Sequence, residues 1–226
     1  MSSVGYIKKS SEKHLLERRE YSLFNKTVVF IKDPLPKEVN MTKVIKDIEK
    51  KLPSVLAHDL DAIYVGQFPE LNSREVESVY MNGAVFISNK QNSVEEMCSS
   101  VVHEVAHGVE ERYGEDIYGD SELVSEFLAK RKKLSNLLQQ QGINCNMKMF
   151  LGLDYNQQFD DFLYKEVGYD LVNRLAANLF VSPYAATSMR EYFANGFEHF
   201  FCKEPEYLEK ISPKLYSKIL SLTTNN

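Results

Sequence analysis

The stretch SSVVHEVAHGVEERYG (99–114) decides how this sequence is interpreted, because two histidines lie four residues apart with a glutamate directly after the first. Valines at positions 101, 105 and 109 recur around them with helical period. Upstream, Ser93 and Glu96 form the pattern of a capping box, which predicts the start of a helix. We expect this helix to run to about Arg112, with Gly114 as its stop.

His103 and His107 project from the same helix face about one turn apart, so both imidazoles can reach one Zn²⁺. Glu104 lies roughly 100° further around the helix. There it stands beside such an ion rather than on it, and can take a proton from an attacking water. The alternative interpretation is a surface helix with two solvated histidines. The metzincin class is excluded, because Glu110 and Tyr113 stand where it has glycine and its third histidine.

A catalytic zinc site needs a third protein ligand and leaves a fourth position open. Nothing in the sequence directs the other histidines to the metal, namely His14, His58 and His199. The stretch YAATSMREYFANGFEHFF (184–201) predicts an aromatic helix that must pack inside, and its Glu191 is the candidate third ligand. Glu198 is the alternative ligand. Without the histidine motif, a solvated helix glutamate would be the simpler interpretation of Glu191.

Composition excludes several classes of function. The chain has 226 residues and a net charge of −5, so no basic face favours a nucleic acid as partner. The cysteines are odd in number and show no metal-finger spacing, which indicates free, buried thiols in a reducing compartment: Cys98, Cys145 and Cys202. No run of 18 apolar residues occurs, so we expect no membrane span.

The polar lead of residues 1–25 lacks the apolar segment of a secretory signal. We therefore expect a cytoplasmic protein, or one delivered by a non-classical route or within a particle. A short helix is expected around His14–Tyr21. The oligomeric state is left open by the sequence.

Hydrophobic periodicity predicts an α+β fold, mostly helical, with a small mixed sheet that precedes the histidine helix. Strands are expected at 27–33, 61–68 and in a hairpin over 78–88, where Asn82-Gly83 suits a tight turn. Further helices are expected at 39–53, 121–141, 159–181 with a break near Gly168, 187–201 and 204–222. Residues 142–158 are expected to be irregular. We expect one domain over residues 1–226, with 204–226 as its C-terminal helices.

Two short motifs give the sequence a resemblance to a known family. HEVAHG (103–108) matches the zinc helix of the metalloprotease domain of anthrax lethal factor and its smaller relatives, among them the secreted Pro-Pro endopeptidases. EYFANGF (191–197) is similar to that family's E-[FY]-F-A-x-x-F stretch, and Tyr184 stands seven residues before its first glutamate, as in the family pattern. The strands and hairpin upstream also fit. The resemblance spans roughly residues 25–203.

The resemblance implies a zincin-like α+β fold of the gluzincin type. It implies Zn²⁺ held by His103, His107 and Glu191, with Glu104 as general base. It also implies that the Tyr184 hydroxyl donates to the developing oxyanion, where a neutral phenol stabilises charge that forms only in the transition state.

The sequence departs from the family pattern at three points. Asn195 stands where relatives often have an acidic residue, and an amide can bond a ligand histidine but adds no charge. The stretch between His107 and Tyr184 is longer than in the toxin, and residues 115–160 are interpreted as an insertion, with an extra helix and loop near the cleft. A secretion signal is also missing.

These observations predict a zinc-dependent endopeptidase. Its protein or peptide substrate is expected to bind extended along an edge strand near Ala84–Ser88 by β-addition. The alternative from another class is a structural or interaction protein of the same fold in a larger assembly, for example a phage-encoded one, whose zinc site is retained for stability and is weakly active or inactive. The presence of Glu104 favours the enzyme, because a structural site needs no base. An immunity or antitoxin-like binding module has only the acidic balance in its favour.

Overall fold

The structure, a computed structural model, describes residues 20–74 and 76–224, which form an α+β fold that is mostly helical. This fold class is the predicted one. The described residues fall into two compact units: unit 1 holds residues 20–50 and 60–101, and unit 2 holds residues 51–59 and 102–224. Helix α4 (Val94–Tyr118) begins in unit 1 and continues into unit 2. The single domain expected over residues 1–226 stays a prediction.

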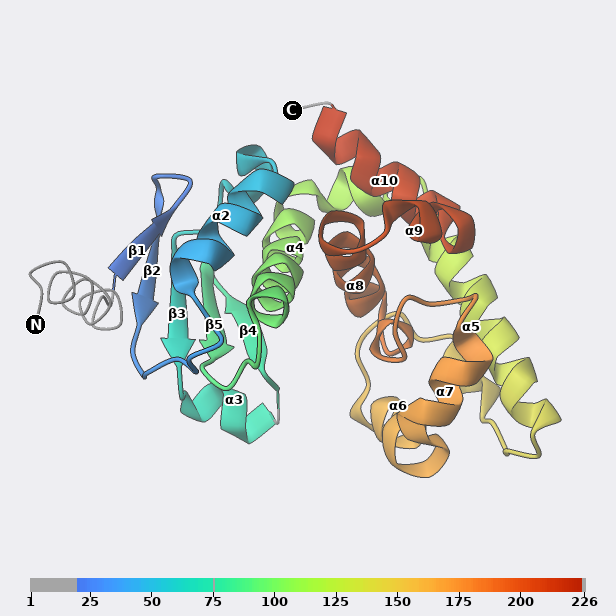
Figure 1. Cartoon of the computed structure of the whole chain (residues 1–226). Coiled ribbons are helices and arrows are strands. Elements are labelled where there is room, and N and C mark those ends of the chain that lie inside the picture. Colours follow the sequence, from blue (N-terminus) through green and yellow to red (C-terminus); the bar gives the residue numbers. More distant parts are fainter. Residues whose placement is uncertain (1–19, 75, 225–226) are drawn as a thin grey trace, which may run out of the picture. The chain divides into compact units, whose positions relative to one another are not determined.

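Unit 1 contains a mixed sheet with the strand order β1-β2-β3-β5-β4 (Figure 1). Its strands are β1 (Glu20–Leu23), β2 (Thr27–Ile31), β3 (Ala62–Gly66), β4 (Ser78–Met81) and β5 (Ala84–Ser88). The central pairs, β2 with β3 and β3 with β5, are parallel, while the two outer pairs are antiparallel. The small mixed sheet before the histidine helix is therefore confirmed.

One face of this sheet supplies the core of unit 1. Val29, Ile63 and Val85 pair across the three central strands and are all buried. The alternation of side chains along a strand places Val28 on the other face, where it is 51% exposed. Figure 1 shows helix α2 (Met41–Lys51) and the start of α4 on one face of the sheet, and helix α3 (Pro69–Arg74) follows β3.

The predicted hairpin is confirmed, but the predicted edge strand is wrong. Asn82 and Gly83 both have positive φ, 49° and 81°, as a tight two-residue turn requires. The segment Ala84–Ser88 forms β5, which pairs with β3 on one side and β4 on the other. Its backbone groups are therefore used within the sheet and cannot receive a peptide. The strand at that edge is β4.

The short helix predicted around His14–Tyr21 is wrong at its end, because Tyr21 lies in β1 and pairs with Val29 of β2. Pairing with a neighbouring strand overrides the local helical pattern. The rest of that prediction lies outside the described residues.

Unit 2 is helical in its described part. Its α-helices after α4 are α5 (Glu122–Gln140), α6 (Gln157–Asp161), α7 (Tyr169–Ala176), α8 (Met189–Cys202), α9 (Pro205–Ile211) and α10 (Pro213–Thr224). Shorter turns are η1 (Ser54–Ala57), η2 (Met147–Phe150), η4 (Tyr184–Ala186) and η3 (Phe162–Gly168), the last of them π-helical. The break predicted near Gly168 is confirmed, since this glycine has a φ of 83°.

Residues 115–160, interpreted as an insertion, form the end of α4, all of α5, an irregular stretch with η2, and the start of α6. Helix α5 belongs to the core of unit 2, because Phe127, Leu134 and Leu138 are fully buried. Whether the segment is an insertion relative to other proteins stays a prediction.

Helix α4 extends further than its predicted end near Arg112. Its helical geometry breaks at Tyr113, with φ −110° and ψ 21°, and then resumes as far as Tyr118. Gly114 is therefore not the stop. Buried Ile117 and a bond between the Tyr118 hydroxyl and Glu110 hold the last turn in place, a tertiary reason that the local pattern does not contain.

Two predictions from composition are also answered for the described residues. Among these residues, no helix combines the length and the apolar character needed to cross a membrane. The three cysteines form no disulfide; Cys98 and Cys145 are buried, and Cys202 is half-buried.

Candidate metal centre

Helix α4 presents the two motif histidines from consecutive turns of one face. Val105 and Val109 anchor this part of the helix in the core. His103 and His107 face into the same region, and their ring centroids are 5.2 Å apart. Only half of the predicted capping box forms at the helix start: the Glu96 amide donates to Ser93 Oγ at 3.0 Å, while the Glu96 carboxylate accepts from the Asn92 amide.

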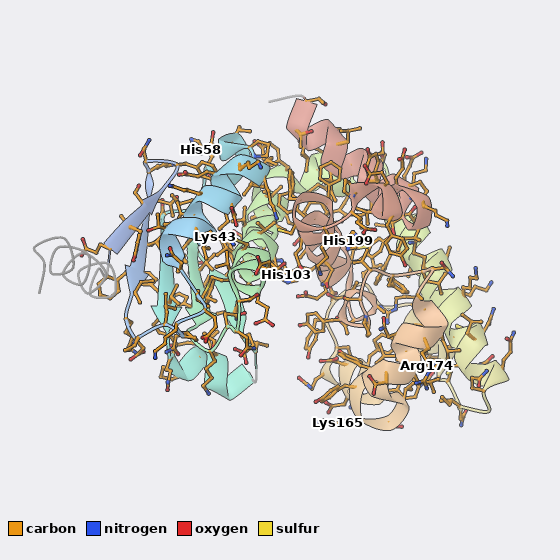
Figure 2. The ribbon with its side chains drawn as sticks, in the orientation of Figure 1. Lys43, His58, His103, Lys165, Arg174 and His199 are labelled. Carbon is orange, nitrogen blue, oxygen red and sulfur yellow. The ribbon has the colours of Figure 1, made fainter. Side chains whose placement is uncertain are left out.

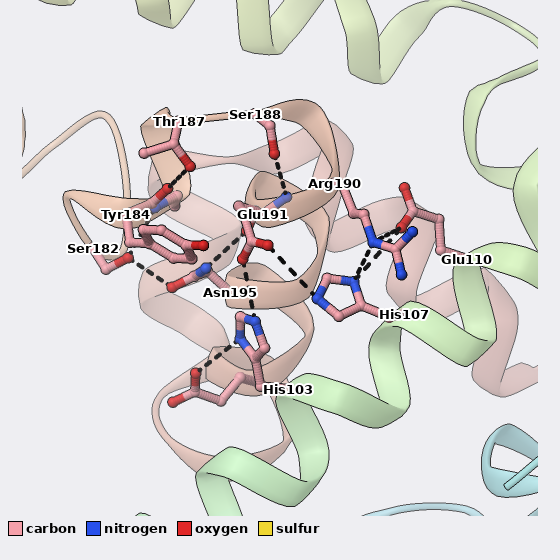
Figure 3. A network of polar contacts seen from close by, with 12 residues as sticks. His103, His107, Glu110, Ser182, Tyr184, Thr187, Ser188, Arg190, Glu191 and Asn195 are labelled. Atoms are coloured by element: carbon pink, nitrogen blue, oxygen red, sulfur yellow. Dashed lines mark hydrogen bonds and ion pairs between the residues drawn. The ribbon is translucent and has the colours of Figure 1, made fainter. Parts of the chain in front are cut away.

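Helix α8 presents the third candidate ligand from its first turn. Ser188 caps this helix, and its Oγ accepts from the Glu191 amide at 3.1 Å. Tyr192, Phe193 and Phe197 are buried, so the aromatic face fixes the rotation of the helix, as the sequence predicts. With that face in the core, the Glu191 carboxylate points toward α4 (Figure 3).

The three side chains converge within metal-binding reach (Figure 3). His103 Nε2 lies 3.2 Å from Glu191 Oε2, and His107 Nε2 lies 3.7 Å from Glu191 Oε1. One ligand atom from each residue can be chosen so that all three lie within 4.8 Å of one another. Tetrahedral zinc with bonds of about 2.0–2.1 Å places its ligand atoms roughly 3.3–3.5 Å apart. This group could therefore hold a metal ion.

The buried carboxylate of Glu191 is compatible with a cation in this group. Glu191 Oε2 is buried and receives no well-aligned hydrogen bond from the described residues, although His103 Nε2 is 3.2 Å away. A buried carboxylate oxygen in this state is destabilising unless a cation pairs with it. Two imidazoles and one carboxylate are also a donor set that zinc accepts in proteins.

The electrostatics of the group favour positive charge. Burial alone would lower the pKa of His103, but the carboxylates of Glu191 and Glu198 outweigh it and raise that pKa to about 10. Burial would likewise raise the pKa of Glu191, yet the hydrogen bond and positive charge of His103 hold it below its ordinary value. Without a metal, His103 carries a proton that faces the Glu191 carboxylate. A divalent cation would replace that proton and supply the positive charge.

Each histidine has a carboxylate on the side away from Glu191. Glu198 Oε2 lies 3.6 Å from His103 Nδ1, and Lys203 pairs with Glu198 at 3.0 Å. Glu110 Oε2 lies 3.8 Å from His107 Nδ1. Glu198, the alternative ligand, is not part of the three-residue group and instead lies behind His103.

Glu104 and Tyr184, the two predicted catalytic residues, both belong to unit 2. Glu104 is only 4% exposed and is not one of the three grouped ligands, consistent with a place beside the metal. Tyr184 begins the short turn η4, and its hydroxyl lies on the side of Glu191 (Figure 3). Burial, together with the negative charge of Glu191, raises the pKa of Tyr184 above its ordinary value, so its phenol stays protonated.

Asn195 has a different role from the one considered for it. Its Nδ2 donates to the Glu191 carbonyl at 2.9 Å, and its Oδ1 accepts from Ser182 Oγ at 2.7 Å. Nδ2 is thus used within helix α8, and Oδ1 ties the segment before Tyr184 to that helix, so neither amide atom bonds a ligand histidine among the described residues. The side chains behind the histidines are Glu198 and Glu110.

The remaining histidines stay outside the group. Figure 2 labels His58 and His199, away from His103. His58 pairs with Asp59 on the surface, and the His199 ring lies against Tyr207, 5.6 Å between centroids. His14 lies outside the described residues.

Sequence reasoning missed the part played by Glu110, Tyr118 and Arg190. Glu110 follows His107 by three residues and so shares its helix face, a spacing that could have found it. Arg190 precedes Glu191 directly, but its contact with His107 depends on how α8 packs against α4, which no local pattern gives.

The comparisons with known proteins give no family. No protein-family model matches the sequence, and no curated protein matches it significantly.

Proposed function

We propose that the protein is a zinc-dependent endopeptidase. The observation that carries the proposal is the convergence of His103, His107 and Glu191, with buried Glu104 directly after the first histidine. The resemblance of HEVAHG and EYFANGF to the lethal factor-like proteases supports the same reading.

In this proposal His103, His107 and Glu191 hold the metal. When bound, zinc polarises the carbonyl of the scissile peptide bond and makes water more acidic. Glu104 takes a proton from the attacking water and then delivers it to the amine that leaves. Tyr184 donates its phenol proton in a hydrogen bond to the oxygen of the tetrahedral intermediate, where negative charge develops.

The test combines metal content and cleavage on the same preparations. Wild type, Glu104→Ala and a matched control, Glu111→Ala, are purified, their zinc per chain is quantified, and each is incubated with a mixed peptide library read by mass spectrometry. Glu111 lies on the same helix and is exposed. We expect one zinc in all three proteins and cleavage by wild type and Glu111→Ala. Loss of the general base should reduce the rate by about 10²–10⁴-fold.

Other outcomes contradict the proposal in distinguishable ways. A folded wild type that takes up no zinc would refute the metal site itself. One zinc per chain in wild type without any cleavage would favour the structural alternative, in which the ion contributes folding energy only. Equal cleavage by wild type and Glu104→Ala would remove Glu104 from the mechanism.

A further inference from the structure

The surroundings of His107 contain a contact that is incompatible with metal binding as it stands. His107 Nε2 faces Glu191, and Nδ1 accepts a hydrogen bond from Arg190 Nε at 3.1 Å (Figure 3). A neutral imidazole carries one N–H, so this contact places the proton on Nε2. A metal bound between His107 and Glu191 needs the lone pair of Nε2, and the proton must then move to Nδ1.

Once Nδ1 carries the proton, it needs an acceptor, and Glu110 supplies one. Glu110 Oε2 lies 3.8 Å from Nδ1, is buried, and has no hydrogen-bond partner within the described part of the chain. The other carboxylate oxygen, Oε1, already accepts from the Tyr118 hydroxyl at 2.5 Å. Tyr118 therefore fixes the carboxylate and leaves one oxygen for the histidine.

Arg190 can give up its contact with His107 without losing its charge partner. Its Nε lies 3.7 Å from Glu110 Oε2, and its side chain is 47% exposed and so has room to turn. The change of tautomer thus satisfies two buried oxygens at once: the metal pairs with Glu191 Oε2, and the Nδ1 proton pairs with Glu110 Oε2.

We propose that Glu110 is a positioning residue that selects the metal-binding tautomer of His107, and that Tyr118 and Arg190 hold it in place. This inference rests on the proposed function, because it concerns the same metal site. Histidine ligands are usually oriented by a carboxylate or carbonyl on their second ring nitrogen, and loss of that partner weakens metal binding by about 10–100-fold. Here the orienting group follows the second histidine by one helix turn, in the pattern HEVAHGVE (103–110).

Glu110→Gln is the sharpest variant. An amide can keep the bond to Tyr118 through its oxygen, and its NH₂ group then faces His107 Nδ1. An NH₂ group donates and cannot accept, so it favours the wrong tautomer. We expect the zinc dissociation constant to rise by about 10–100-fold. The midpoint of unfolding without zinc should be unchanged, because the amide keeps the bond to Tyr118 and its NH₂ group can donate to His107 Nδ1.

The measurements are zinc affinity, by competition with a chromophoric chelator, and thermal unfolding of the zinc-free proteins. Glu111→Gln is the matched control and should behave as wild type. Tyr118→Phe releases the carboxylate and should weaken zinc binding less than Glu110→Gln does.

Each outcome decides the inference. Equal zinc affinity of wild type and Glu110→Gln would overturn it and leave the proposed function intact. If Glu110→Gln binds zinc more weakly and its zinc-free form also unfolds at a lower midpoint than zinc-free wild type, the role of Glu110 is merely structural, and the inference is overturned. A folded wild type that binds no zinc would overturn the proposed function and this inference together.

Discussion

At the residue scale, Tyr184 is held by contacts that fix its backbone and leave its hydroxyl available for chemistry. Its carbonyl accepts from Thr187 Oγ1 at 2.8 Å, and Ser182 Oγ joins the preceding segment to Asn195. The phenol is therefore placed near Glu191 before any substrate binds. Such preorganisation is what a donor to a developing oxyanion needs.

Tyr184→Phe should separate catalysis from metal binding. The ring is kept and the hydroxyl is removed, so we expect kcat for peptide cleavage to fall by about 10²–10³-fold. Zinc affinity should stay within about twofold of wild type, because Tyr184 is not among the three grouped ligands. Steady-state kinetics and chelator competition measure the two quantities. A large loss of zinc affinity, or unchanged kcat, would contradict the role proposed for the phenol.

At the scale of elements, helices α8 and α10 approach so closely that one position has no room for a side chain. A Cβ added at Gly196 would lie 2.2 Å from Leu215 Cδ2, and Leu215 is fully buried. Glycine is unfavourable inside a helix, so its presence here is explained by this contact and not by helix propensity.

Gly196→Ala should therefore destabilise the protein, although alanine is the better helix former. We expect the free energy of unfolding to fall by about 1–3 kcal/mol, as in other overpacked cores. Gly114→Ala in α4 is the control, because nothing lies within 4 Å of its added Cβ. There the change should be neutral or stabilising by up to about 1 kcal/mol. Chemical denaturation measures both, and equal effects would contradict the packing argument.

The sequence predicted most elements, because their hydrophobic period matches the face that they bury. Helices α2, α5 and α8 and the hairpin lie where the periodicity and the Asn82-Gly83 turn place them. The failures share a cause. Strand β1 exists through pairing with β2, and the last turn of α4 is held by Ile117 and Tyr118, so both depend on contacts that the hydrophobic period does not contain.

The candidate site was likewise predictable where the local sequence pattern determines it. His103, Glu104 and His107 follow from helix spacing alone, and Glu191 came from the resemblance and from the aromatic face of its helix. The positions of two carboxylates behind the histidines were not foreseen. Glu198 was considered only as the alternative ligand, and Glu110 served only to exclude metzincins, because the place of each carboxylate depends on which ring nitrogen faces α8.

At the scale of the whole molecule, the residues of the candidate metal centre all belong to unit 2, although they come from two helices far apart in the sequence. Unit 2 must fold before the site exists. Two buried cations on α5 hold distant segments together there. Arg131 donates to the carbonyls of Met149 and Gly152 and lies 4.1 Å from the centre of the Phe159 ring. Its neighbour Lys130 donates hydrogen bonds to Leu179, Ile211 and Ser212.

Lys130→Met tests whether unit 2 depends on this clamp. Lys130 Nζ donates to Leu179 O, Ile211 O and Ser212 Oγ, each at 2.6 Å, so its loss leaves buried acceptors without donors. We expect the free energy of unfolding to fall by about 3 kcal/mol at pH 7, with no change for exposed Lys133→Met.

Burial lowers the pKa of Lys130 to about 8, below its ordinary 10.5. Between these values the unfolded chain binds more protons, so stability rises with pH. The difference in unfolding free energy between wild type and Lys130→Met should therefore widen from pH 8 to 10. A narrowing difference would mean that folding raises the pKa of Lys130 and does not lower it.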